Sequence, residues 1–561
     1  MAGTGVTIML LLLSFLFSLP INAQNSNCSF APVNLPIRLV GLPNQGFTRG
    51  AYLAMGTPRQ NFSALPMAEV NNTFVFHHDD KCQKTEAACM TYRGGFFEPE
   101  NSPTYVNQSA PNAKLNPNFA SSEKLTDGGT LAQDQITLLD NLTIPDFPFG
   151  LVNQSVNTGR LFNSVSAGLA SIGLGRNSTI LSSLKKAGTI GSRSYGFWWG
   201  LDGATTPAQM NGNLVLGGYD QAKIKDLSKN HTDRLTSPGT CSQGMLITFT
   251  EIKLNFPNGS EPNLLDQFIG GYNLQACICP SCATVMSMPL DPYFSRFVDW
   301  TESVPIDRSV GINFFTMMYA GGTAYQGDLT FTTDAGLSIR VPNSQLVLPD
   351  LTIADDGSIA TNTSVQDLMI YSLQDVNKND MPRIGKYFFT AAYLHVNNDA
   401  NTFTIWEANP TTDTDVVAVL DDDLAKECNV VQPKATPIES SGSVPSSTSS
   451  SSPTGSPPAS KSNKLAAGAI AGIAVGSVAV VGLIAVLLWR GHSRRKQERA
   501  DAAAQANAAL NISPPYQQAV QTPMVEMFGH EPPEVKGSVL PPQELWPGRQ
   551  KYEPDVHEMA G

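Results

Sequence analysis

The side chains best suited to chemistry are two closely spaced cysteines in the run Cys279-Pro280-Ser281-Cys282. A C-x-x-C pair can form a redox-active disulfide or supply half of a zinc site. Redox pairs of this kind lie at a helix N-terminus in a strand–helix–strand unit, which the neighbouring residues do not suggest. The chain also has no second C-x-x-C pair and no H-x3–5-H pair to complete a zinc site.

We therefore interpret the cysteines of this region as partners of distant cysteines in structural disulfides. The residues concerned are Cys277, Cys279 and Cys282 on one side and Cys28, Cys241 and Cys428 on the other. The sequence alone does not choose among their pairings.

Two other groups of residues resemble functional sites. His77-His78-Asp79-Asp80 has the residue types of a metal site, but a short polar run like this is typical of a solvated loop. Asp334-Ala335-Gly336 carries a carboxyl beside a turn glycine, between two alternating apolar segments, which predicts a hairpin turn. We expect neither a metal ion nor a cofactor in this chain.

Residues 167–220 contain the elements that most clearly indicate a fold. A buried segment meets Gly173 and Gly175, where a residue without a Cβ lets two backbones approach closely. An amphipathic helix is predicted next, with Asn177 or Ser178 as its N-cap and Gly188 closing it. An apolar strand at 195–199 follows, and Asn-Gly at 211–212 predicts a turn into a strand at 214–216.

This ordered set resembles the pepsin-like aspartic proteases, in particular the fungal cell-surface members. That family has a Gly-Leu-Gly segment, a helix, an apolar strand and a G-x-L-x-x-G-G-x-D segment in the same order. The resemblance implies an all-β fold with two lobes around a cleft. We expect the first lobe at residues 24–225 and the second at residues 226–431.

Further segments extend the resemblance over most of residues 51–409. Gly56-Thr57-Pro58-Arg59-Gln60 is similar to the family's G-T-P-x-Q turn between long strands, and residues 384–389, 391–396 and 402–406 are similar to its closing segments. Residues 126–138 occupy the place of the flap hairpin, although its tyrosine has no counterpart and Leu125 is nearest. The resemblance also implies a local disulfide between Cys82 and Cys89.

The catalytic motifs of the family are absent. An aspartic protease uses two facing carboxyls that share a proton, each in an Asp-Thr/Ser-Gly turn. Aligning the first motif places Met67 at the aspartate position, and aligning the second places Pro280 there. Glu69 is the one carboxyl within either motif, and a lone acid does not supply the paired mechanism. We therefore assign no catalytic residues.

The ends of the chain indicate a secretory membrane protein. Residues 1–23 read as a signal peptide, and the net charge of -12 argues against nucleic acid as a partner. The eight cysteines fit an oxidising compartment. Candidate N-glycosylation sites are Asn27, Asn61, Asn71, Asn107, Asn141, Asn153, Asn177, Asn230, Asn258 and Asn362.

The C-terminal part predicts a single membrane pass. Residues 432–464 are Ser/Thr/Pro-rich and read as an extended stalk, and residues 465–489 are apolar and long enough to cross about 30 Å of hydrocarbon. Basic residues follow at once, so residues 490–561 are expected to form a disordered cytoplasmic tail. Gly468, Gly472 and Gly476 lie on one helix face, which favours a transmembrane homodimer.

The sequence therefore predicts a catalytically inactive pepsin-like ectodomain at the cell surface, or on a secretory-pathway membrane, that binds a peptide or polysaccharide. One alternative is an aspartic-type endopeptidase with unusual catalytic groups that acts on secreted or cell-wall proteins. Two others remain open: a protease-fold inhibitor of glycosidases, and a stalked protein whose tail is the active part.

Overall fold

The structure is a computed structural model that describes residues 28–78, 83, 85–109, 130–152, 170–237, 239–309, 311–374 and 377–430. All of these residues belong to the first of two compact units, Met1–Ser443. The predicted signal peptide, stalk, transmembrane segment, dimer face and tail lie outside the described residues. No helix within the described residues is long and apolar enough to cross a membrane.

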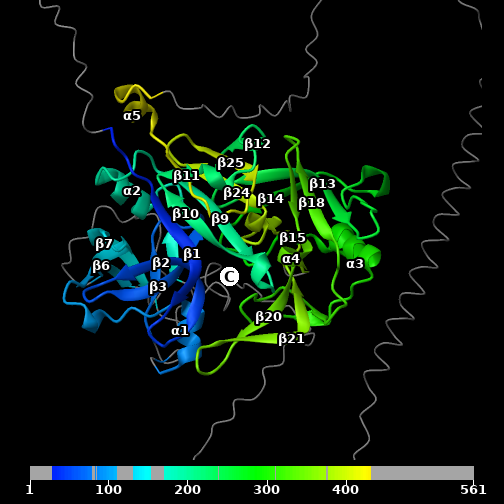
Figure 1. Cartoon of the computed structure of the whole chain (residues 1–561), viewed down its shortest axis with the longest axis horizontal. Coiled ribbons are helices and arrows are strands. Elements are labelled where there is room, and N and C mark those ends of the chain that lie inside the picture. Colours follow the sequence, from blue (N-terminus) through cyan, green and yellow to red (C-terminus); the bar gives the residue numbers. More distant parts are fainter. Residues whose placement is uncertain are drawn as a thin grey trace, which may run out of the picture. The chain divides into compact units, whose positions relative to one another are not determined.

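Strands dominate the described part of the chain, and the largest sheet contains 13 of them (Figure 1). In order across this sheet they are β12 (Asn230–Arg234), β25 (Thr402–Glu407), β24 (Ala392–Asn397), β9 (Ser194–Asp202), β10 (Gln209–Leu216), β1 (Val33–Gly41), β2 (Phe47–Met55), β3 (Gln60–Met67), β8 (Ala170–Gly173), β4 (Phe74–Phe76), β7 (Leu142–Val152), β6 (Thr130–Leu139) and β5 (Val106–Asn107).

Strands between residues 246 and 384, in the C-terminal half of the described chain, form two smaller sheets, which Figure 1 shows in green. One sheet has the order β19 (Ser338–Val341), β18 (Asp328–Thr333), β13 (Leu246–Asn255), β14 (Leu274–Ile278), β23 (Arg383–Ile384), β15 (Met286–Met288) and β22 (Ile370–Ser372). Another has the order β16 (Asp307–Arg308), β17 (Met317–Ala320), β21 (Ile359–Leu368) and β20 (Val347–Ile353). The strands β11 (Gly218–Asp220) and β26 (Val416–Ala418) form a separate pair.

Helices are short in the described residues. They are α1 (Ala87–Arg93), α2 (Thr179–Lys186), α3 (Ser295–Thr301), α4 (Asn343–Leu346) and α5 (Asp422–Glu427). The predicted helix after Gly175 is confirmed as α2. Its N-cap is Ser178, whose side chain accepts a hydrogen bond from the Leu181 N–H, and Gly188 follows its end at a φ of 71°.

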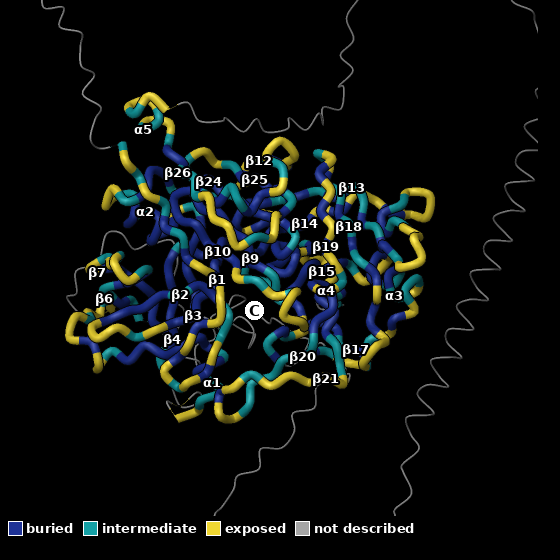
Figure 2. Tube along the Cα trace, viewed as in Figure 1, coloured by how far each residue is buried: buried dark blue, intermediate teal, exposed yellow. Residues whose placement is uncertain are grey.

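Buried apolar residues of both halves of the chain belong to one core cluster. Figure 2 shows buried residues, in dark blue, in both halves. Strand β24 of the C-terminal half pairs with β9 of the N-terminal half, so Leu394 lies opposite Phe197. Phe197 also packs edge-to-face on Phe389 at a centroid distance of 5.5 Å. A disulfide between Cys28 and Cys428 joins residues 400 positions apart.

A second bridge between the halves is the hairpin β20–β21, which reaches below α1 in Figure 1. At its tip, the Gly357 carbonyl accepts a hydrogen bond of 2.8 Å from the buried Thr91 hydroxyl. The two halves of the chain are therefore joined at two places, by the pairing of β24 with β9 and by the contact of the β20–β21 hairpin with Thr91 of α1.

Two sequence predictions about turns have opposite outcomes. The hairpin turn at Asp334 is confirmed, because it connects the antiparallel strands β18 and β19. The turn at Asn211-Gly212 is wrong, because β10 passes through both residues. Gly212 instead allows β10 to pass close to β9, since a Cβ on Gly212 would lie 2.2 Å from the Trp198 carbonyl oxygen. The chain reverses direction earlier, at residues 203–208.

Candidate functional site

Two loops occupy equivalent places in the two halves of the chain. The first loop, residues 68–73, follows β3, and the second loop, residues 279–285, follows β14. Strand β3 runs parallel to β8, with Met67 opposite Gly173. Strand β14 runs parallel to β23, with Ile278 opposite Ile384 and Gly385 next in the chain. Each loop therefore turns beside an Ile-Gly segment.

The first loop is held by backbone contacts with the residues that follow β8. The Leu174 N–H donates to the Met67 carbonyl and the Gly175 N–H donates to the Val70 carbonyl, each at 2.8 Å. A Cβ on Gly173 would lie 2.3 Å from the Asn72 carbonyl oxygen, so the predicted close approach at this glycine is confirmed.

The second loop is held in the same manner. The Cys279 N–H donates to the Ile384 carbonyl and the Lys386 N–H donates to the Cys282 carbonyl, each at 2.8 Å. A Cβ on Gly385 would lie 2.3 Å from the Cys282 carbonyl oxygen. The second loop differs from the first in being closed by a disulfide between Cys279 and Cys282.

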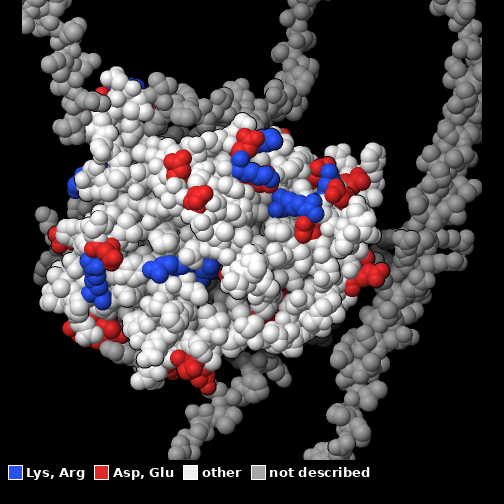
Figure 3. Space-filling model, viewed as in Figure 1, with Lys and Arg blue, Asp and Glu red and all other residues white. Residues whose placement is uncertain are grey.

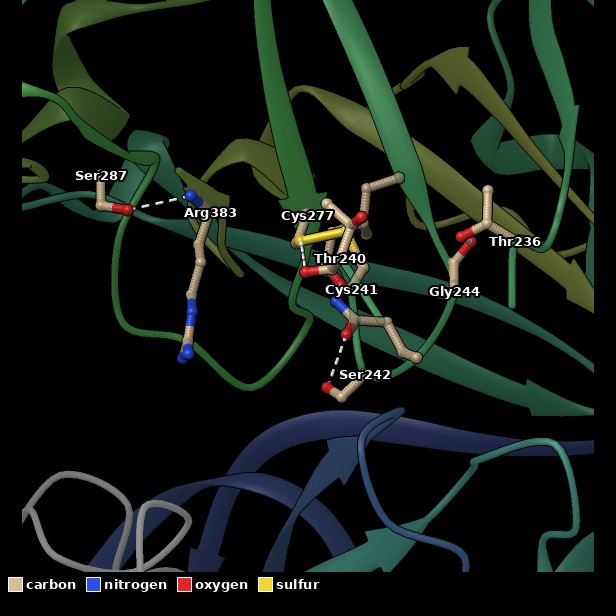
Figure 4. The surroundings of a disulfide bond; sticks show 10 residues. Thr236, Thr240, Cys241, Ser242, Gly244, Cys277, Ser287 and Arg383 are labelled. Atoms are coloured by element: carbon tan, nitrogen blue, oxygen red, sulfur yellow. Dashed lines mark hydrogen bonds between the residues drawn. A yellow bond between two sulfur atoms is a disulfide. The ribbon is translucent and has the colours of Figure 1, made fainter. Parts of the chain in front are cut away.

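This pairing corrects the disulfides expected from the sequence. Cys279 and Cys282 bond to each other rather than to Cys28, Cys241 or Cys428, because the turn brings their Cα atoms to 5.5 Å. Cys241 pairs with Cys277, as Figure 4 shows. Cys89 is disulfide-bonded, whereas Cys82, its predicted partner, lies outside the described residues.

The positions assigned to the two missing aspartates carry no ionisable group. Met67 is 5% exposed and packs with Val70, Phe74 and Phe96 in a small apolar cluster of the N-terminal half. Pro280 is buried in the second loop. Neither residue can take or give a proton.

Glu69 is the acidic residue that the first loop directs toward the second loop. The residue as a whole is half-buried, but its Oε2 atom is inaccessible and accepts no hydrogen bond from the described residues. Burial raises the pKa of Glu69, while the charge of Arg383 and the hydroxyl of Ser281 act in the opposite direction.

Tyr195 and the Cys279–Cys282 disulfide are further neighbours of Glu69. Burial also raises the pKa of Tyr195, and the neighbouring Glu69 adds to that shift. A Glu69 carboxylate oxygen and the sulfurs of Cys279 and Cys282 all lie within 4.8 Å of one another. The sequence identified Glu69 as the one acid in the motifs, but its position between the two loops was not foreseen.

Such a site can supply one proton donor or acceptor, whereas the paired-acid mechanism requires two. The residues that face Glu69 from the second loop are a serine and a disulfide, and neither is an acid.

Two groups of described residues have metal-ligand atoms close together. One is Glu69 with Cys279 and Cys282, whose sulfurs are joined in the disulfide and so are not thiolate ligands. The other is His77, His78 and Glu98, in which His78 Nδ1 lies 3.1 Å from Glu98 Oε1 and His77 Nδ1 lies 2.9 Å from the Phe97 carbonyl. The residues Asp79 and Asp80 of the same motif lie outside the described residues.

The remaining site predictions concern the surface. Of the candidate glycosylation sites, Asn61, Asn107, Asn141, Asn177, Asn230, Asn258 and Asn362 are exposed, whereas Asn27 and Asn153 lie outside the described residues. Asn71 is half-buried in the first loop, where its Oδ1 accepts a hydrogen bond from the Asn177 N–H at 2.9 Å. The expected flap is described only from Thr130, in the hairpin of β6 and β7, and Leu125 is not described.

Two comparisons with known proteins show which proteins this chain is similar to. The sequence model of the family described as "Eukaryotic aspartyl protease" matches residues 50–245, which include the first loop and end before the second. Candidapepsin from Candida tropicalis is 22% identical over 410 residues, which is 71% of this chain and 88% of that protein. These matches, with the mostly-β structure, make the chain similar to pepsin-like aspartic proteases over the matched residues.

Proposed function

We propose that this protein is a catalytically inactive member of the pepsin-like aspartic protease family that binds extended peptides. The observation that carries the proposal is the content of the two loops. The first loop presents one glutamate, the second presents a serine and a disulfide, and the aligned aspartate positions hold Met67 and Pro280. The backbone contacts that hold both loops are present, but the two loops do not supply the pair of acids that the family's reaction needs.

A peptide is the ligand class that this frame favours most directly. Figure 3 shows acidic and basic side chains scattered over one face rather than gathered in a patch, so we do not propose a strongly charged ligand. With a net charge of -12, nucleic acid is not the partner that we propose. A polysaccharide ligand is the competing outcome of the binding experiment below.

We further propose that the binding unit is the ectodomain of a single-pass membrane protein, at the plasma membrane or in the secretory pathway. The support is the apolar segment at 465–489 with basic residues after it, together with the candidate signal peptide and the exposed glycosylation sites. Fractionation of cells that express the full chain tests this arrangement. Release by carbonate washing without detergent would contradict it.

The binding proposal can be tested with the full chain in detergent. A random library of decapeptides is incubated with the immobilised protein at pH 4 and pH 7, and bound peptides are eluted and sequenced by mass spectrometry. We expect an enriched set of peptides that is recovered uncut. Enrichment of wall oligosaccharides in a parallel experiment, with no peptide retained, would overturn the choice of ligand.

A pair of variants locates the binding site. Ser281→Trp fills the space between the loops, and Ser338→Trp places the same side chain on an exposed position of β19 as a control. We expect the first variant to lose peptide retention and the second to keep it. Equal retention by both variants would place the ligand elsewhere.

An aspartic-type endopeptidase is the second candidate function, and the placement of Glu69 is the observation that favours it. A single buried carboxyl of raised pKa can act as a general acid or base, and such a group contributes typically about 10²–10⁴-fold in rate. If this function is correct, peptides retained at pH 4 will be recovered as fragments, and Glu69→Gln will leave them intact.

A further inference from the structure

The Cys279–Cys282 disulfide is placed differently from the neighbouring Cys241–Cys277 disulfide. In the Cys241–Cys277 bond, the two residues are 1% and 5% exposed, so solvent reaches neither sulfur freely. Cys279 is also buried, at 2%, but Cys282 is partly exposed in the second loop. The Cys279–Cys282 bond therefore joins one buried residue to one partly exposed residue, whereas both residues of the Cys28–Cys428 bond are partly exposed.

A cation lies at the open end. Arg383 Nη1 is 3.9 Å from Cys282 Sγ, and the Arg383 side chain is exposed. Figure 4 shows the Arg383 backbone N–H held by Ser287 Oγ, a bond of 2.9 Å, while the side chain extends away from the Cys241–Cys277 disulfide. A guanidinium beside a cysteine stabilises the thiolate over the thiol. Cys282 is thus the sulfur that would carry negative charge after reduction.

Two proton-bearing groups, the Ser281 hydroxyl and the Glu69 carboxyl, lie beside the disulfide. Ser281 Oγ is 3.5 Å from Cys279 Sγ, and the Glu69 carboxyl lies within 4.8 Å of both sulfurs. Because burial raises the pKa of Glu69, its carboxyl keeps a proton to higher pH than an exposed glutamate does. Because Cys279 is the buried sulfur and Arg383 lies beside Cys282, Cys279 is the sulfur that Glu69 would protonate as it leaves.

We propose that Cys279–Cys282 is a thiol–disulfide exchange site for a low-molecular-weight thiol, with Cys282 as the interchange cysteine and Cys279 as the resolving cysteine. A small thiol is the substrate class because Cys282 is only partly exposed between the loops. This inference does not rest on the proposed peptide binding, since it concerns a reaction of the second loop itself.

The exchange balances as two steps. In the first, a thiolate RS⁻ attacks Cys282 Sγ, the bond between Cys282 and Cys279 breaks, and Cys279 Sγ takes the electron pair and a proton from the Glu69 carboxyl. In the second, another RS⁻ attacks the mixed disulfide at the sulfur of R, which releases RSSR and leaves the Cys282 thiolate beside Arg383. Two thiols are oxidised to RSSR while the protein disulfide is reduced to the dithiol, and reversal of both steps restores the disulfide.

The first test uses the unmodified full chain. It is incubated with increasing reduced glutathione at pH 7, free thiols are trapped with iodoacetamide, and labelled cysteines are identified by peptide mass spectrometry. We expect labelling of Cys279 and Cys282 at least about tenfold faster than labelling of Cys241 and Cys277. Labelling of the two pairs at equal rates would overturn the proposal.

The second test separates the two sulfurs with variants that lose the same disulfide. In Cys279→Ser, the remaining Cys282 is expected to form a mixed disulfide with oxidised glutathione, and in Cys282→Ser, the remaining Cys279 is expected to react at least about tenfold more slowly. An intact Cys241–Cys277 bond in both variants verifies folding. Faster reaction of Cys279 would reverse the assigned roles and contradict the proposal.

The role of the cation is tested in the Cys279→Ser background. Adding Arg383→Gln is expected to slow alkylation of Cys282 at pH 7 by about tenfold and to move its pH profile to higher pH. Adding Arg340→Gln instead removes an exposed arginine that is paired with Asp328, and the profile is expected to stay unchanged. An unchanged profile in the Arg383 variant would remove the basis for Cys282 as the thiolate.

Discussion

The first and second loops share a backbone arrangement and differ in almost every side chain. Each follows a strand that runs parallel to an Ile-Gly segment, and each packs its carbonyls against that glycine, Gly173 in one half and Gly385 in the other. The first loop then presents Glu69, whereas the second is closed by the Cys279–Cys282 disulfide. The common frame depends on backbone contacts, so it does not require the same side chains in the two loops.

The largest expected effect comes from breaking the shared frame. Gly173→Val and Gly385→Val would each place side-chain atoms against carbonyl oxygens that already lie 2.3 Å from an ideal Cβ. Because backbone cannot move aside as a flexible side chain does, we expect each change to cost more than about 3 kcal/mol. Thermal unfolding and the yield of folded protein measure the loss.

A matched glycine provides the control for that comparison. Gly239 is exposed, and the nearest atom to an added Cβ is 3.9 Å away, so Gly239→Val should unfold at nearly the temperature of the unchanged protein. If Gly385→Val were as stable as Gly239→Val, the two loops would not share a frame of the kind described.

The next effect concerns the buried acid of the C-terminal half, Asp367. Burial, with Asp350 nearby, raises the pKa of Asp367 from 3.8 to about 7, and its Oδ1 atom has no hydrogen-bond partner in the described residues. A raised pKa of an acid means that its stabilising contribution is complete below pH 3.8 and is lost as the pH rises through about 7. The shift corresponds to at most about 4 kcal/mol.

Asp367→Asn should therefore flatten the fall in stability between pH 4 and pH 7. Thermal unfolding of the variant and the unchanged protein across that range measures the effect. Asp399→Asn is the opposing control, because hydrogen bonds from Arg193 and Lys185 outweigh burial and lower the pKa of Asp399. That variant should be less stable than the unchanged protein throughout pH 4–7, with a deficit that shrinks as the pH falls below 3.8. Identical pH profiles for the two variants would contradict both assignments.

A smaller effect separates the two loops directly. Glu69→Gln removes the cost of ionising a buried carboxyl, so its unfolding temperature should exceed that of the unchanged protein at pH 7 and match it near pH 4. Ser281→Ala changes the facing loop without a charge and should shift unfolding equally at both pH values. A pH-independent effect of Glu69→Gln would place its carboxyl in solvent.

Much of the frame could be predicted from the sequence, because local rules decide it. Ser178 reads as an N-cap and Gly173 as a close approach, and both follow from nearby residues alone. The turn predicted at Asn211-Gly212 is wrong, because the same pair of residues that favours a turn also permits a strand to pass close to Trp198.

The site depends on contacts between residues far apart in the sequence, which local sequence patterns do not predict. Cys279 bonds to Cys282 because the second loop turns back beside Gly385, about a hundred residues later in the chain. Glu69 faces that loop because Met67 turns into the apolar cluster of the N-terminal half. The sequence shows that Glu69 stands between the apolar residues Ala68 and Val70, but this pattern does not predict which way its carboxyl points.

We propose that the protein keeps the frame of an aspartic protease without its reaction. The most direct test incubates the full chain with a peptide library at pH 3–5, with and without a transition-state inhibitor of aspartic proteases, and analyses cleavage by mass spectrometry. We predict no inhibitor-sensitive cleavage by the unchanged protein or by Glu69→Gln. Cleavage that the inhibitor blocks and that Glu69→Gln abolishes would contradict the account.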